Sequence, residues 1–154
     1  MSDSTNECAR QLLEAVPMVM RAIRTEMRSH RESDLSVTQF RALIYLNRHK
    51  GASLSDLAEH LGLTLPSMSK MINLLVVRNL VARCTDLGDR RRVVLTPTAG
   101  GRKAMESAYE VTRARLAERL AALPPCECAT VVEAMKSLRS LFVHGHGVEE
   151  AVTA

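Results

Sequence analysis

Two neighbouring groups of polar side chains are the part of this sequence best suited to binding chemistry. The first group is small or hydrogen-bonding, and its spacing places it on one side of a helix. Its members are Pro66, Ser67, Ser69, Lys70 and Asn73. The second group is a run of three arginines, Arg90 to Arg92, directly after the turn sequence Asp86-Leu87-Gly88-Asp89. Hydroxyl, amide and cationic groups in such an arrangement hydrogen-bond to the base edges and phosphate oxygens of nucleic acids.

Positive charge is concentrated in the same segment. The chain of 154 residues has a formal charge of +4. Between Thr64 and Arg92 there are six Lys and Arg against two Asp, and the rest of the chain has fifteen residues of each sign. A localised basic patch is typical of proteins that bind a phosphate backbone. A solvated basic hairpin would carry the same charges, so the charge favours DNA binding only together with the helical pattern.

A pair of short helices is predicted to position the first polar group. The first helix ends at Gly62 and begins with a capping box formed by Ser53 and Asp56. Thr64 is a good N-cap for the second helix, and Pro66 in its first turn needs no N–H donor there. The second helix has one apolar stripe, roughly opposite the polar group. The stripe consists of Met68, Met71, Ile72 and Leu75. A helix, a short turn and a helix with a polar outer face is the arrangement that places a recognition helix in a DNA major groove.

A β-hairpin is predicted to position the arginines. The segments Val81 to Thr85 and Arg92 to Thr96 are rich in β-prone residues, and the turn sequence at 86–89 lies between them. A hairpin directly after a recognition helix is the wing of a winged helix. Arginine at the tip of a wing suits the narrow, electronegative minor groove.

The segment from Leu35 to Gly101 resembles the MarR family of bacterial winged-helix transcription regulators. The matching pieces are LSVTQFRALIYL, LSDLAEHLGLTLPSMSKMINLL, RNLVAR and DLGDRRRVVLTPTAGGR. The most specific features are an Asp-x-Arg wing tip, here Asp89 and Arg91, and a Thr-x-x-Gly entry into a long helix, here Thr98 and Gly101.

The resemblance carries the family's DNA-reading role onto the polar group of the second helix (Pro66, Ser67, Ser69, Lys70 and Asn73). It also implies that Arg91, with Arg90 beside it, enters the minor groove while Asp89 holds Arg91. The sequence departs from the family pattern by having apolar residues where polar or charged ones are usual. These are Leu65, Leu74, Val76 and Val77. They leave open that part of this helix covers a partner or a ligand pocket.

The predicted fold is mainly α with a small β-wing, a winged helix-turn-helix core flanked by long terminal helices. We expect a single domain over residues 1–154, with the DNA-binding lobe at 36–97. Helices at 7–31 and 98–143 carry apolar stripes that this lobe cannot bury entirely, and a second copy is the simplest partner. The resemblance implies the same homodimer. A monomer with those helices folded back is the alternative.

Cysteines suggest a second form of control. Pro124 and Pro125 are predicted to end one helix, and the last helix follows from about Cys126 to Val143. Cys126 and Cys128 are candidate redox residues because they lie at its start, where the helix dipole favours a thiolate. Cys84 is expected to be a packing residue. His144 and His146 lie near the far end of the last helix, so one chain cannot bring them to Cys126 and Cys128. A metal site that uses both pairs would need a second subunit, and we expect none.

Several function classes find no support in the sequence. It contains no Gly-rich phosphate loop, no HExxH motif and no convincing nucleophile–base pair, so we expect neither an enzyme nor a cofactor. No run of eighteen apolar residues and no signal-like start occurs, which predicts a cytoplasmic protein without membrane contact.

We therefore predict a homodimeric, sequence-specific DNA-binding transcriptional regulator that recognises a pseudo-palindromic operator. The resemblance favours a repressor released by a small-molecule ligand, which the family often binds. The alternatives are the same fold acting as a thiol-redox or metal sensor, and a winged helix used for protein–protein binding.

Overall fold

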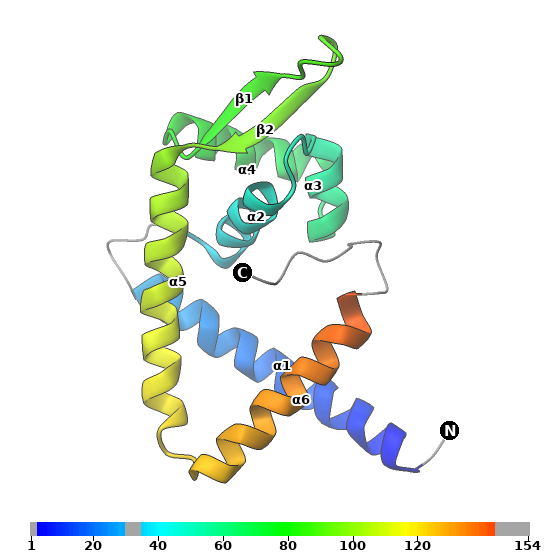
Figure 1. Cartoon of the computed structure of the whole chain (residues 1–154), viewed down its shortest axis with the longest axis vertical. Coiled ribbons are helices and arrows are strands. Elements are labelled where there is room, and N and C mark those ends of the chain that lie inside the picture. Colours follow the sequence, from blue (N-terminus) through cyan, green and yellow to red (C-terminus); the bar gives the residue numbers. More distant parts are fainter. Residues whose placement is uncertain (1–2, 30–34, 144–154) are drawn as a thin grey trace. The chain divides into compact units, whose positions relative to one another are not determined.

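The computed structural model describes residues 3–29 and 35–143 (Figure 1). The elements in chain order are α1 (Asp3–Ser29), α2 (Val37–Arg48), α3 (Leu54–Leu61), α4 (Leu65–Val77), β1 (Val81–Thr85), β2 (Val93–Pro97), α5 (Ala99–Leu120) and α6 (Pro125–Val143). They form two compact units, residues 1–115 and 116–154. The predicted class, mainly helical with a two-stranded antiparallel wing, is confirmed. That the whole chain forms one domain stays a prediction.

Local hydrogen bonds explain where the helices of the lobe begin. The hydroxyl of Ser36 accepts the N–H of Gln39, and the Gln39 side chain accepts the N–H of Ser36 in return. Ser53 and Asp56 form the same reciprocal box at α3, with 2.7 Å from the Ser53 nitrogen to Asp56 Oδ2. Thr64 caps α4 by accepting the N–H of Ser67. Each cap satisfies backbone donors that a helix start leaves unpaired. The capping box predicted at Ser53 and Asp56 and the predicted Thr64 cap are confirmed.

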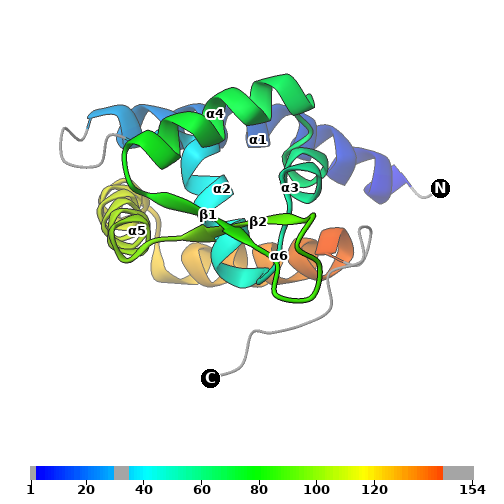
Figure 2. The same cartoon turned by 90° about the horizontal axis from the view of Figure 1, so that it is seen from above.

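One core holds α2, α3, α4 and the hairpin together (Figure 2). Its most deeply buried large side chains are apolar and come from four elements. They are Leu43, Leu57, Met68, Ile72, Leu75 and Val81. Three of the four residues in the predicted apolar stripe of α4 are fully buried, and the fourth, Met71, packs against the core while partly exposed. Burial of this stripe sets the rotation of α4 about its own axis.

The hairpin begins its second strand one residue later than predicted. Val81 pairs with Pro97 and Thr85 pairs with Val93, so Arg92 lies outside the strand. The Arg92 N–H donates a hydrogen bond to the Asp89 carbonyl, 2.9 Å away. Arg92 therefore belongs to the turn and not to the strand.

A tight junction joins α4, the hairpin and α5. Asn79 adopts a left-handed conformation with φ of 55°, which Asn tolerates better than most residues other than Gly. The Leu80 carbonyl accepts the N–H of Thr98 at 3.0 Å, and a Cβ built on Gly101 would lie only 1.9 Å from that oxygen. Gly101 is therefore required by the close approach of α5 to the end of α4.

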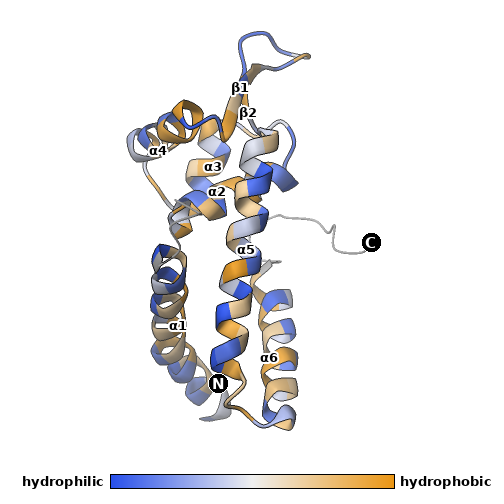
Figure 3. Ribbon diagram, turned by 90° about the vertical axis from the view of Figure 1, so that its left-hand side faces the viewer, coloured by the Kyte–Doolittle hydropathy of each residue, from blue (hydrophilic) through white to orange (hydrophobic). Residues whose placement is uncertain are grey.

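The first helix begins earlier than predicted, and the last two residues of its predicted range, 7–31, lie outside the described residues. The first helix, α1, begins at Asp3 rather than Glu7, because an acid in the first turn complements the helix dipole and Arg10 pairs with Glu7 and Glu14 within the helix. Pro17 lies inside α1 without ending it and supplies no backbone donor there. Figure 3 shows hydrophobic residues along α1 and α6. None of the described helices is long and apolar enough to cross a membrane.

Replacing Gly101 with Ala should destabilise the fold. The added methyl group meets the Leu80 carbonyl, and such overpacking costs about 1–3 kcal/mol in the free energy of unfolding. Gly100 is the matched control, because its Cβ would lie 3.5 Å from the Asn79 oxygen, an ordinary contact. Gly100→Ala should leave stability unchanged or raise it by up to about 1 kcal/mol through helix propensity. Urea unfolding of both variants measures the difference, and equal effects would contradict this view of the junction.

Candidate nucleic-acid interface

The recognition helix α4 turns a polar face toward solvent. Since Met68, Ile72 and Leu75 are fully buried, the residues on the opposite side project outward. Of the five predicted DNA-reading residues, Ser69 is half-buried and the others are exposed. The exposed ones are Pro66, Ser67, Lys70 and Asn73.

Asn73 has a partner that the sequence did not suggest. The Arg83 guanidinium in β1 donates a hydrogen bond to the Asn73 side-chain oxygen. This bond holds Arg83 beside the outward face of α4 and adds a positive charge to it. The sequence shows Arg83 as part of the basic segment but does not predict its place at the site. Only the packing of β1 against α4 brings Arg83 and Asn73 together.

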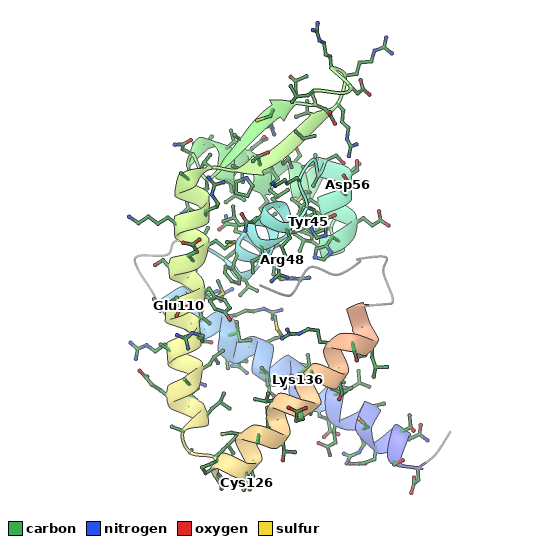
Figure 4. The ribbon with its side chains drawn as sticks, in the orientation of Figure 1. Tyr45, Arg48, Asp56, Glu110, Cys126 and Lys136 are labelled. Atoms are coloured by element: carbon green, nitrogen blue, oxygen red, sulfur yellow. The ribbon has the colours of Figure 1, made fainter. Side chains whose placement is uncertain are left out.

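The wing turn is shaped by two aspartates. The Asp86 carboxylate accepts the N–H of Gly88 at 2.8 Å, and the Asp89 carboxylate accepts the N–H of Arg91 at 2.9 Å. Asp89 thus holds Arg91 through a charge-assisted bond to its backbone. Within the described residues no hydrogen bond or ion pair engages the guanidinium groups of Arg90 and Arg91, both of which are exposed. Figure 4 shows side chains of this turn extending into solvent.

Arg92 has a different role from its two neighbours. Its guanidinium donates to the Gly51 carbonyl at 3.1 Å and lies 3.3 Å from the Asp56 carboxylate in α3. Arg92 therefore fastens the wing to the helix-turn-helix, and only Arg90 and Arg91 remain available at the tip. The Ser53 hydrogen bonds, and then the charge of Arg92, hold the pKa of Asp56 below its usual value.

A stack of rings joins α2 to α3 behind this tether. Tyr45 (labelled in Figure 4) lies between His49 and His60, with ring centroids 4.1 and 4.3 Å apart. Burial, followed by the nearby charges of Asp56 and Glu59, raises the pKa of the Tyr45 hydroxyl. Since Tyr45 and His49 belong to α2 and His60 to α3, the stack fixes the helix that precedes the recognition helix.

The four apolar departures in α4 separate into two kinds. Val76 packs against the core, so it is not available to a partner. Leu65, Leu74 and Val77 are exposed, and Val77 is 84% accessible.

The cysteines are all free thiols. The prediction that Cys84 packs is wrong, because β1 leaves the core after Ala82 and the Cys84 side chain is exposed. Cys126 is exposed at the start of α6 (Figure 4), whereas Cys128 is half-buried with its sulfur 3.8 Å from the Leu120 carbonyl. Their redox role stays a prediction. No group of three metal-ligating side chains occurs in residues 3–29 and 35–143, and His144 and His146 lie outside those ranges.

Comparison with known proteins identifies the family. A sequence model of the MarR family matches residues 33–92, from before α2 to the end of the wing turn. The HTH-type transcriptional regulator YfiV of Bacillus subtilis strain 168 is 31% identical over 105 residues, which are 68% of this chain and 66% of YfiV. This chain belongs to the MarR family.

Solved structures extend the comparison to nearly the whole MarR-family chain. RV1404 from Mycobacterium tuberculosis is 22% identical with a TM-score of 0.79, and the alignment covers 99% of this chain and 100% of RV1404. The transcriptional repressor CouR, bound to a 23-mer DNA duplex, is 23% identical with a TM-score of 0.67, covering 87% of this chain and 95% of CouR. At these identities the likeness is one of fold. The aligned part spans just under two thirds of YfiV.

Replacing Asp56 with Asn should weaken the tether in a pH-dependent way. Because the folded pKa of Asp56 is lowered, its contribution is present above the usual value of 3.8 and is lost as pH falls through the folded pKa. At neutral pH we expect a loss of about 0.5–1 kcal/mol in the free energy of unfolding. The gap between wild type and variant should close in acid. Glu59→Gln, at the other end of α3, is the control and should cost less. A gap that stays constant from pH 7 to pH 3 would contradict the role given to Asp56.

Proposed function

We propose that the chain is a homodimeric, sequence-specific DNA-binding regulator of transcription that represses by occupying a pseudo-palindromic operator. The observation that carries this proposal is the outward polar face of α4, which lies opposite the buried stripe and is joined by the exposed arginines of the wing. CouR, which has the same fold, is a repressor bound to a DNA duplex.

Each element of this surface has a role that follows from its chemistry. The hydroxyls of Ser67 and Ser69, the Lys70 ammonium and the Asn73 amide bind base edges or flanking phosphates in the major groove. Pro66 fixes the backbone at the start of α4. Arg91, with Arg90, enters the minor groove at a narrow point, where the negative potential of the DNA is greatest.

A second copy of the chain supplies the other recognition helix. Large apolar side chains are exposed along α6, with Val131, Met135 and Phe142 on one face at 40%, 50% and 71% accessibility. In α1, Val16 and Val19 are three residues apart on one face and are 47% and 55% accessible. Burial of such faces between two copies gives a two-fold dimer whose recognition helices reach successive major grooves.

A small-molecule ligand releases the operator by favouring a dimer in which the recognition helices have the wrong spacing. A hollow of about 390 Å³ beside α5 is lined by Met105, Glu106, Tyr109 and Glu110, and its volume falls within the range of small-ligand sites. The thioether and phenol supply an adaptable apolar wall, and the two carboxylates favour a ligand with a hydrogen-bond donor or a positive charge.

Selection from a random duplex pool on the purified protein, at near-physiological salt, tests the proposed function. We expect an inverted repeat with half-sites about 10–10.5 base pairs apart, since a two-fold dimer reads the same sequence twice. Binding without any enriched motif, lost as salt rises, would contradict sequence-specific recognition and indicate attraction by the basic wing alone.

Replacing Arg91 with Ala should weaken DNA binding and flatten its salt dependence. Loss of one phosphate-proximal cation lowers the slope of log affinity against log salt by about 0.9 per subunit. Arg113→Ala is the matched control, because it removes the same charge from α5, where Arg113 pairs with Glu110, and should change the slope less. Titrations at several salt concentrations give both slopes. Equal slopes for wild type and Arg91→Ala would contradict a DNA contact at this residue.

Replacing Met135 with Glu should dissociate the dimer. A two-fold interface contains the substitution once in each copy, so two carboxylates lose their water when the dimer forms. The dissociation constant should therefore rise by roughly two orders of magnitude. Lys136→Glu introduces the same side chain at the next residue, where Lys136 pairs with Glu133 away from the apolar stripe, and should remain dimeric. Sedimentation velocity distinguishes the two. If the Met135→Glu protein stays dimeric, this face of α6 is not part of the dimer interface.

A further inference from the structure

Two large apolar side chains lie on the outward face of the recognition helix. Leu74 and Val77 are 57% and 84% accessible and are three residues apart, so they are neighbours on the helix surface. Lys70 and Asn73 precede them by four residues each and therefore share their face. Val76, between them, packs against the core instead.

The charges around this pair restrict what can cover it. Lys70 lies on the same face, and Arg83 is held beside it by its bond to Asn73. The exposed Arg90 and Arg91 of the wing add two more cations to the same lobe. A partner that complements these charges is polyanionic, yet it must offer apolar groups to Leu74 and Val77. The major groove of DNA meets both conditions, because the C5-methyl of thymine is the apolar group among its base edges.

We infer that Leu74 and Val77 read thymine methyl groups, so that each operator half-site carries thymine at base pairs beneath the second half of α4. This inference rests on the proposed function and adds to it a feature of the DNA sequence that is recognised. The two side chains have no hydrogen-bonding group, so they discriminate thymine from cytosine and adenine through the methyl contact alone.

Uracil substitution isolates this contact, because uracil lacks only the methyl group of thymine. The probes are the duplex recovered by selection and copies in which each thymine of one half-site is replaced by uracil in turn. For wild type, at least one replacement should weaken binding roughly fourfold, the factor that corresponds to burying one methyl-sized group. In a Leu74→Gln/Val77→Ser variant, which removes both branched apolar side chains, the affinities for the thymine and uracil duplexes should be equal.

A control variant and a folding measurement complete the test. Leu87→Ala removes a fully exposed leucine from the wing turn and leaves α4 unchanged, so it should retain the fourfold ratio. Thermal unfolding of the double variant should match wild type, since both replaced side chains are exposed.

The outcomes separate this inference from the proposed function. Failure to select any specific duplex would overturn the proposed function. A specific duplex that binds equally well with uracil at every position would overturn only the thymine inference, as would a double variant that keeps the fourfold ratio. In either of those cases the apolar pair is left to a protein partner.

Discussion

Burial of one stripe of α4 is the constraint on which the rest of the interface depends. Met68, Ile72 and Leu75 have no accessible surface, and a helix that buries one side so completely has a fixed rotation. The polar residues on the other side therefore face outward without needing any contact of their own. Two further contacts place the neighbouring elements relative to this helix. Arg92 fastens the wing to α3, and Gly101 lets α5 approach the Leu80 carbonyl closely.

The wing illustrates how adjacent residues of one type acquire different roles. Hydrogen bonds from the backbone to Asp86 and Asp89 fix the turn, and Arg92 leaves that turn toward the helix-turn-helix. Arg90 and Arg91 stay at the tip, exposed and ready to meet phosphate or a minor groove. The backbone of this turn is held before any binding, so the conformational entropy lost on binding would come mainly from the side chains of Arg90 and Arg91.

Features of this fold that depend on near neighbours were predictable from sequence. The caps at Ser36, Ser53 and Thr64 each involve a residue three positions away. The buried apolar residues of α4 are likewise spaced three or four residues apart. The two contacts of Arg92 join residues that are 41 and 36 positions apart in the sequence, and the bond from Arg83 to Asn73 joins a strand to a helix. No local sequence pattern predicts such contacts. The prediction that Cys84 packs in the core is wrong for a related reason, because its exposure depends on how far β1 extends beyond the core.

Hydroxyl-radical footprinting of the protein on its selected duplex shows whether α4 and the wing form one DNA-binding surface in each of two copies. We predict protection on one face of the duplex, in two blocks about one helical turn apart, with flanking minor-groove protection that Arg91→Ala removes. A single block, or protection that is uniform along the duplex and unaffected by Arg91→Ala, would contradict it.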